Sequence, residues 1–258
     1  MKPGGPAHWR RIVQALTVPL LLLAALEAYL RLQGSGSDAL APPSQAGSAW
    51  LRAARDGSLW QATAFTLGSA ALGLSIGTLG GLTVGVVLGL SRRAAAVGFL
   101  AIELLRPVPS VALIPLALLV FGFGLRMEVA VVAFATFWPM LVLTQAATRQ
   151  VDPGLLEVAR ALELAPWDQV RKIVLPAIVA RLFVAFRLGV AIALVVAVTV
   201  EIAANPHGMG YSMMIAQQSL DPASMLAWLV WIGVVGAVID SLAQALQRRV
   251  AARMGAQT

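Results

Sequence analysis

Long apolar blocks, separated by short polar intervals, constrain this sequence more than any other feature. The clearest blocks cover residues 62–90, 128–148, 177–200 and 224–246, and each reaches the length of about 20 residues with which an α-helix crosses a bilayer. Charged residues make up only 12% of the chain, whereas soluble domains carry about 25%. We therefore expect an all-α integral membrane protein with a single transmembrane domain over residues 1–258.

Two further blocks bring the expected number of spanning helices to six. Residues 12–30 follow a short basic start. We interpret them as an uncleaved first span, because the run is longer than a usual signal-peptide core and no small-residue cleavage site follows it directly. Residues 95–122 contain Pro107 and Pro109. Each proline removes a backbone donor and disfavours helix at the residue before it, so we expect a kink or an unwound turn there.

This break and the charges of the fifth span are the candidates for a transport pathway. Irregular backbone at membrane depth is tolerated only where protein or a water-filled cavity satisfies it, so the break lies either at the membrane interface or along the pathway. Arg187 lies about 16 Å along its helix from Pro176, at 1.5 Å per residue. A charge at that depth requires a partner or water, and both a structural ion pair and a functional role stay open. The pathway candidates are Arg106, Pro107, Pro109, Ser110, Arg187 and Glu201.

Five glycines recur at intervals of four residues within residues 62–90. Such a stripe of small residues allows a second helix to approach backbone to backbone. The stripe predicts either a static packing seam or a seam that slides during gating. These helix-packing residues are Gly73, Gly77, Gly81, Gly85 and Gly89.

Basic residues are distributed unequally between the two sides of the expected membrane. One set of intervals holds Lys2, Arg10, Arg11, Arg92, Arg93, Arg149, Arg160, Arg171, Lys172, Arg248, Arg249 and Arg253. The opposite set holds only Arg31, Arg52, Arg55 and Arg126. Because cytoplasmic loops carry the excess of Lys and Arg, we expect both termini and residues 152–176 in the cytoplasm.

Composition excludes several kinds of site. The chain has no cysteine, which excludes disulfides, thiolate catalysis and Cys-ligated metals. Its two histidines, His8 and His207, lie far apart in sequence, so we expect no metal site. Basic residues lie at the ends of apolar blocks and not in one patch, which argues against nucleic acid as a partner. No Gly-x-x-x-x-Gly-Lys-Ser/Thr phosphate loop occurs, so we expect any ATP to be hydrolysed by another chain.

Residues 152–176 form the longest charge-rich interval between two apolar blocks. Asp152 is a good N-cap and Pro153 suits the first helical position, while Pro166 opens a second short helix in the same way. Pro176 interrupts or resets the helix that follows. We expect a helix–turn–helix outside the lipid, with an ordinary amphipathic surface helix as the alternative. The apolar residues at helical spacing are Leu155, Leu156, Ala159 and Leu162.

The same interval resembles the cytoplasmic loop of pattern E-A-A-x3-G-x9-I-x-L-P in permease subunits of bacterial ABC importers. Val158 and Glu163 depart from that pattern, and Glu163 stands where a glycine would supply a left-handed residue without steric cost, which leaves the turn geometry open. The resemblance implies that the loop docks into a groove of an ATPase, and we assign the face that carries Ala159 to this groove. The matching residues are Glu157, Ala159, Ile173, Leu175 and Pro176. The implied ATPase-coupling residues are Glu157, Val158, Ala159, Arg160, Leu162 and Glu163.

The likeness extends over roughly residues 60–250, which resemble the nitrate/sulfonate/taurine-type permeases. It is carried by the runs GLSRRAAAVGFLAIELLRPVPSVALIPLALLVFGFG and GMGYSMMIAQQ. The resemblance implies a type I ABC importer permease in the bacterial inner membrane, in contact with the lipid bilayer. The implied partners are a second permease subunit, forming a homodimer, two ABC ATPase subunits and a periplasmic solute-binding protein. The chain itself is then no enzyme and binds no cofactor, because ATP and Mg²⁺ are held by the ATPase subunits.

The expected function is to form the translocation pathway for a small anion, similar to sulfonate, nitrate or taurine. One alternative is a permease of the same fold that imports a vitamin precursor. Another is an ion-coupled secondary transporter, which would normally carry an acidic residue near mid-membrane. A membrane scaffold is the third. Because polar groups are scarce within the spans, we expect this chain to hold no tight solute site, and the alternative is a specific pocket at residues 106–110.

Overall fold

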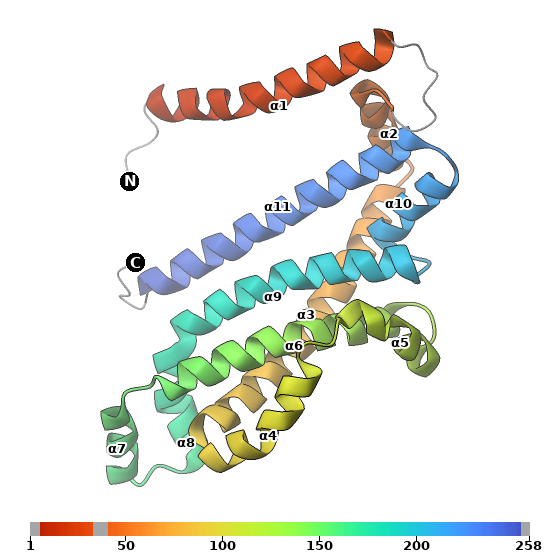
Figure 1. Cartoon of the computed structure of the whole chain (residues 1–258). Helices are drawn as coiled ribbons and strands as arrows, with labels where there is room; N and C mark the ends of the chain where they lie inside the picture. Colours follow the sequence, from red (N-terminus) through yellow and green to blue (C-terminus); the bar gives the residue numbers. More distant parts are fainter. Residues whose placement is uncertain (1–5, 33–40, 254–258) are drawn as a thin grey trace. The chain divides into compact units, whose positions relative to one another are not determined.

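The computed structural model describes residues 6–32 and 41–253, and all regular structure in these ranges is helical. Judged by the contacts between its residues, the chain divides into two compact units. The first comprises residues 1–60 and 212–231, and the second comprises residues 61–211 and 232–258. The helices, labelled in Figure 1, are α1 (Pro6–Leu32), α2 (Pro43–Arg55), α3 (Ser58–Leu90), α4 (Arg92–Leu105), the 3₁₀-helix η1 (Ser110–Leu113), α5 (Ile114–Phe121), α6 (Leu125–Arg149), α7 (Pro153–Ala161), α8 (Pro166–Gln169), the π-helix η2 (Val170–Val174), α9 (Leu175–Ala203), α10 (Gly208–Gln218) and α11 (Pro222–Arg253).

Four helical segments of the described chain are long and apolar enough to cross a membrane, namely Ser58–Leu90, Leu125–Arg149, Pro166–Ala203 and Pro222–Val250. A fifth candidate is the pair α4 and η1–α5, which bends by 84° at a short break. These findings confirm the all-helical membrane fold. The first expected span, residues 12–30, falls within α1, part of whose side chains lie outside the described residues, so the total of six spans stays a prediction.

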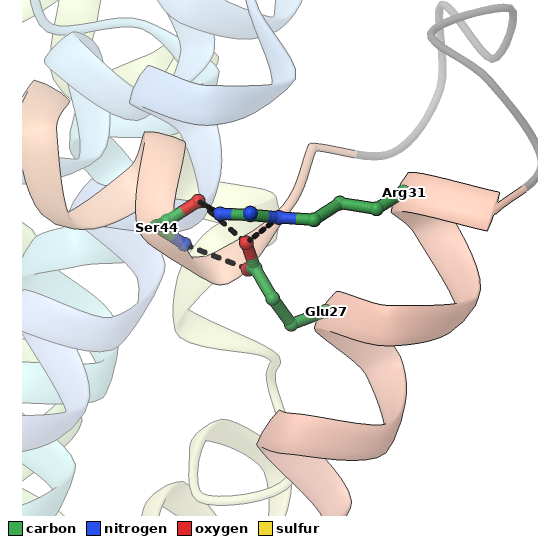
Figure 2. A network of polar contacts seen from close by, with 3 residues as sticks. All are labelled: Glu27, Arg31 and Ser44. Atoms are coloured by element: carbon green, nitrogen blue, oxygen red, sulfur yellow. Dashed lines mark hydrogen bonds and ion pairs between the residues drawn. The ribbon is translucent and has the colours of Figure 1, made fainter.

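In the first unit, a polar contact ties α1 to the start of α2 (Figure 2). Glu27 of α1 accepts hydrogen bonds from the hydroxyl of Ser44 at 2.7 Å and from its backbone N–H at 3.0 Å. Arg31, one turn further along α1, lies 2.6 Å from the same carboxylate. Since the first N–H groups of a helix have no partner within it, Glu27 serves as a cap for α2.

Two tryptophans of the same unit, Trp50 and Trp60, pack against Trp231. The ring centroids of Trp50 and Trp60 lie 5.7 Å and 5.8 Å from that of Trp231, and the indole N–H of Trp60 donates to the carbonyl of Ala54 at 3.1 Å. Tryptophan is enriched where a membrane protein meets the membrane–water interface. The cluster therefore indicates that this region lies at the membrane–water interface.

The second unit has its core around α6 and α9, which run side by side (Figure 1). Fully buried apolar side chains from both helices, among them Val132 and Val200, pack with Ala70 of α3 and Ile114 of α5. A second apolar cluster, which includes Val86 and Ile178, lies beneath the segment that joins α6 to α9. Helix α9 contributes to both clusters, so it connects the membrane-spanning core to the polar loop.

Close packing joins α3 to α6 along the glycine stripe. A Cβ added at Gly73 would lie 2.6 Å from Cβ of Val132, and one added at Gly81 would lie 2.6 Å from the carbonyl oxygen of Phe137. The glycines at 77, 85 and 89 face the same helix at similar range. The two backbones therefore touch over the length of the stripe, which only residues without a side chain permit.

The break predicted at the two prolines separates α4 from η1. Helix α4 ends at Leu105, and Pro109, with an extended backbone, precedes η1. Few backbone hydrogen bonds cross the break, and one of them joins the N–H of Val108 to the carbonyl of Leu105 at 3.2 Å. This confirms the unwound turn, because proline supplies no N–H to continue the helix.

The turn between α7 and α8 is a Schellman motif. The N–H of Leu164 donates to the carbonyl of Ala159, and the N–H of Glu163 donates to that of Arg160, both at 3.0 Å. Glu163 has a φ of 51°, so it adopts the left-handed conformation that usually selects glycine at this position. The turn expected for a glycine is thus present with a glutamate, at a cost of roughly 1–2 kcal/mol for the left-handed backbone.

We predict that Gly81→Ala destabilises the protein while Gly68→Ala in the same helix does not. A methyl group at Gly81 would meet the α6 backbone, whereas nothing lies within 4 Å of a Cβ at Gly68. Overpacking costs about 1–3 kcal/mol, and alanine in an open helical position gains up to about 1 kcal/mol over glycine. Thermal unfolding of both variants in detergent measures the difference, and equal melting temperatures would contradict the close packing of α3 on α6.

Candidate functional sites: the helix break and the α7–α8 loop

The break between α4 and η1 lines a cavity of about 430 Å³ in the second unit. Arg106 and Ser110 contribute from the break, Phe134 and Trp138 from α6, and Leu188 from α9. Pro107 and Pro109 are not among its lining residues, so they shape the turn without entering the cavity. This volume lies within the range of small-molecule sites, about 300–1,000 Å³.

The polar side chains that line this cavity can all donate hydrogen bonds. Arg106 forms no ion pair with any residue that the structure describes, and no acidic residue lines the cavity. The indole Nε1 of Trp138 is buried and has no hydrogen-bond partner within the described chain, although an indole N–H can only donate. Buried donors without a partner are rare in proteins. An arginine, a free indole N–H and a hydroxyl together suit an anionic ligand.

Arg187, the second pathway candidate, lies elsewhere and is paired. Its Nε is 3.0 Å from Oδ1 of Asp240 in α11, and Asp240 also accepts a hydrogen bond from Gln244 at 2.7 Å. Both charged side chains are a little over 40% exposed. Of the two roles that the sequence leaves open, the structure shows the ion pair.

Glu201, the third candidate, is fully buried in a polar cluster with Glu128. It accepts hydrogen bonds from the hydroxyl of Thr66 at 2.6 Å and from the N–H of Gly210 at 2.8 Å. Gly208, with a φ of 95°, passes so close to this carboxylate that a Cβ would collide with it. Glu201 therefore holds the start of α10 and does not line the cavity at the break.

Glu128 completes this cluster and was not singled out by the sequence. Its two carboxylate oxygens accept hydrogen bonds from the hydroxyl of Ser69 and from the side-chain amide of Asn205. These partners lie 59 and 77 residues away in the chain, so no local pattern could indicate the cluster. An acidic residue in the first turn of an apolar helix is the one signal that the sequence offers.

The α7–α8 loop, residues 152–176, begins as its sequence predicts. Asp152 caps α7 by accepting a hydrogen bond from the N–H of Gly154 at 2.8 Å, and Pro153 occupies the first helical position. One side of α7 faces the protein through Leu156, which packs on the apolar cluster with Val86. The other side is exposed and apolar.

We call this exposed apolar side the outer face of the loop. Leu155, Val158 and Leu162, which are 43%, 52% and 64% exposed, follow one another at helical spacing. Trp167 of α8 is also exposed, at 70%. Exposed apolar residues that gather on one face mark an interaction surface.

Ala159 does not belong to this outer face. It is only 1% exposed, because α7 turns this side toward the chain, and its contact with an ATPase groove stays a prediction. Glu157 and Arg160 are exposed and lie 3.9 Å apart, a separation at which a solvated ion pair contributes little to stability. Glu163 forms the turn described above.

The second half of the loop is continuous with a spanning helix. Helices α8, η2 and α9 form one helical segment, Pro166–Ala203, of 38 residues. A π-helical turn at residues 170–174 precedes Pro176, which lies in the first turn of α9. π-helical turns are a usual way for a helix to accommodate an irregularity. A displacement of α8 would therefore be transmitted directly into α9.

Sequence reasoning missed the cavity-lining residues of α6. Phe134 and Trp138 belong to the run FATFWP, and their rings pack edge to face with centroids 5.6 Å apart. An indole N–H beside Pro139 in the middle of an apolar block is the signal that could have marked this site, since buried indoles normally have a hydrogen-bond partner.

Comparisons with known proteins agree with the fold. The putative aliphatic sulfonates transport permease protein SsuC of Bacillus subtilis (strain 168) is 34% identical over 180 residues, which cover 70% of this chain and 65% of that relative, a little under two thirds of its length. The bicarbonate transport system permease protein CmpB of Synechococcus elongatus is 26% identical over 260 residues, covering 96% of this chain and 94% of that relative.

A solved structure, of inward-facing conformations of the MetNI methionine ABC transporter, matches with a TM-score of 0.61 at 20% identity, over 72% of this chain and 92% of that chain. At this identity the match shows the fold alone. Residues 77–252 match the family described as binding-protein-dependent transport system inner membrane component. The chain therefore belongs to that family, as a permease subunit with the type I ABC importer fold and not as an enzyme.

Proposed function

We propose that this chain forms half of the transmembrane pathway of an ATP-driven importer. Two copies enclose the pathway, two ATPase subunits bind their α7–α8 loops, and a periplasmic binding protein delivers the solute. The observation that carries the coupling is the outer face of the loop, because its apolar residues are exposed on α7 and α8, and α8 is continuous with α9. The chain itself binds no nucleotide, so ATP and Mg²⁺ are held by the partner subunits.

The coupling follows from the geometry of the loop. Closure of two ATPases on ATP would draw the two α7–α8 loops together, and the continuous helix from Pro166 to Ala203 would carry this displacement into the membrane. Leu188 and Ile192 of that helix line the cavity at the break, so the cavity would change shape with the loop. Such a movement drives transport only if it shifts an equilibrium between inward- and outward-facing states.

A small anion is the solute that the cavity favours. The proposal is supported by the donor groups of Arg106, Ser110 and Trp138 and by relatives named for aliphatic sulfonates and bicarbonate. A neutral vitamin precursor would leave the guanidinium of Arg106 without a counter-charge. The cavity thus supports a specific pocket at residues 106–110 over a pathway without a solute site.

An ion-coupled transporter is the second candidate, because Glu128 and Glu201 are buried within spanning helices. All four of their carboxylate oxygens, however, accept hydrogen bonds from the protein, which suits a structural cluster. Uptake into vesicles that contain the permease, the ATPase and the binding protein separates the two functions. We expect ATP to drive uptake and an ion gradient alone to fail.

We predict that Leu162→Asp weakens ATPase binding about tenfold or more and uncouples ATP hydrolysis from uptake. The substitution places an unpaired charge in the docking surface and removes an apolar contact. Arg126→Gln, which removes an exposed charge outside the loop, is the control. Co-purification and ATPase assays of the reconstituted complex measure both effects, and wild-type coupling in Leu162→Asp would show that the outer face does not dock.

For the cavity, we predict that Trp138→Phe and Arg106→Gln each slow ATP-driven uptake about tenfold, since a hydrogen bond to a charged group contributes roughly 1.5–3 kcal/mol. Arg126→Gln removes a comparable exposed charge outside the cavity and should transport normally. Unchanged ATPase binding in all three variants confines the effect to the solute. Normal uptake by Arg106→Gln would show that the cavity is not part of the translocation pathway.

We also propose that both termini and the α7–α8 loop are cytoplasmic, from the excess of Lys and Arg on that side. A reporter enzyme that is active only in the periplasm should be silent when fused after residue 254 and active when fused at residue 208. Activity of the first fusion, or silence of the second, would reverse the orientation.

A further inference from the structure

We propose that a second cavity, at the ends of α3 and α6, binds the phosphate group of an anionic phospholipid. This cavity, of about 650 Å³, is separate from the cavity at the helix break and belongs wholly to the second unit. Its walls come from the end of α3, the start of α4, the end of α6 and the start of α7. The proposal does not depend on which solute the protein transports.

The charges of this cavity select an anion. Arg92 and Arg149 line it, and neither forms an ion pair with a residue that the structure describes. No acidic residue is among the lining residues, and Asp152, which stands between two of them in the sequence, accepts a hydrogen bond from the N–H of Gly154 as the cap of α7. Two guanidinium groups without a counter-ion suit a phosphate, to which arginine can donate two hydrogen bonds at once.

A buried hydroxyl in the wall of this cavity has no hydrogen-bond partner, which is independent support for a ligand. Thr148 lines the cavity, is only 2% exposed, and its Oγ1 forms no hydrogen bond within the described chain. In a spanning helix a threonine hydroxyl can bond to a backbone carbonyl of its own helix, as Thr136 does at 2.9 Å. Thr148 does not, so its buried hydroxyl lacks the partner that a buried donor normally has.

The position of the cavity indicates a lipid as the source of the phosphate. It lies where two candidate spans, Ser58–Leu90 and Leu125–Arg149, both end, which is the level at which lipid headgroups meet the protein. Phe99 of α4, 63% exposed, forms part of the wall together with Leu88 and Leu90. An acyl chain would cover the exposed side chains of Phe99 and Leu90, whereas free phosphate would leave them exposed.

The remaining wall links this site to the coupling loop. Pro153 and Leu156 of α7 line the cavity, and Leu156 also packs on the apolar cluster beneath the loop. A bound headgroup would therefore brace α7 against α3 and α6. Basic pockets between spanning helices on the cytoplasmic side are suited to anionic headgroups for the same electrostatic reason.

The test compares lipid retention by the purified permease–ATPase complex. Native mass spectrometry in the presence of equal amounts of phosphatidylglycerol and phosphatidylcholine should show preferential retention of phosphatidylglycerol. The double variant Arg92→Gln/Arg149→Gln should retain about tenfold less of it. Arg93→Gln is the matched control, because Arg93 is an exposed neighbour that carries the same charge outside the cavity, and it should behave as the wild type.

Two further measurements make the result decisive. The double variant should keep the wild-type melting temperature in detergent without added lipid, which separates loss of binding from loss of folding. Inorganic phosphate at millimolar concentration should neither stabilise the complex nor displace phosphatidylglycerol. Equal retention of both lipids, an equal loss in Arg93→Gln, or displacement by inorganic phosphate would each overturn the proposal, the last in favour of a soluble phosphate compound.

Discussion

Inside a bilayer, every backbone N–H and C=O must find its partner within the protein, and the structure depends on this constraint throughout. It accounts for the uniformly helical fold of the described residues. It also gives the helix break its significance, because the 84° bend between α4 and η1 leaves backbone without helical partners. The protein places that irregular segment against a cavity whose mostly apolar lining includes Arg106 and Ser110. The break and the cavity therefore belong together, because irregular backbone within the membrane requires protein or a water-filled cavity beside it.

The same constraint explains how charge is handled within the spans. Arg187 is matched by Asp240 across two helices, and the carboxylates of Glu128 and Glu201 are surrounded by hydroxyl, amide and backbone donors. Arg106 lacks such a partner. The guanidinium of Arg106, unpaired within the described chain, lines one cavity with Trp138, whose indole N–H is also without a partner there, and this combination indicates a ligand.

The sequence predicted those features of the fold that depend only on neighbouring residues. The apolar blocks, the proline break and the capped start of α7 follow from hydropathy, from the missing N–H of proline and from the Asp152–Pro153 pair. The face of α7 could not be assigned in this way, because Leu156 and Ala159 on one side and Val158 and Leu162 on the other satisfy the same helical periodicity. Tertiary packing decides between them, and Ala159 turned out to be buried. The Glu163 turn shows the converse, since hydrogen bonds of the surrounding motif hold a non-glycine residue in a left-handed conformation.

The glycine seam between α3 and α6 limits how this protein can change shape. The residues of α6 that meet the stripe also recur every four positions, as Val132, Thr136, Met140, Thr144 and Thr148. A partial slide would drive their side chains into the α3 backbone, and the pattern would match again only after a full step of four residues, about 6 Å. Because intermediate positions along the seam are blocked by these clashes, α3 and α6 move as one rigid body. Conformational change must then be concentrated in the remaining helices, and α9, which is continuous with α8 of the loop, would have to carry it along its packed interface with α6.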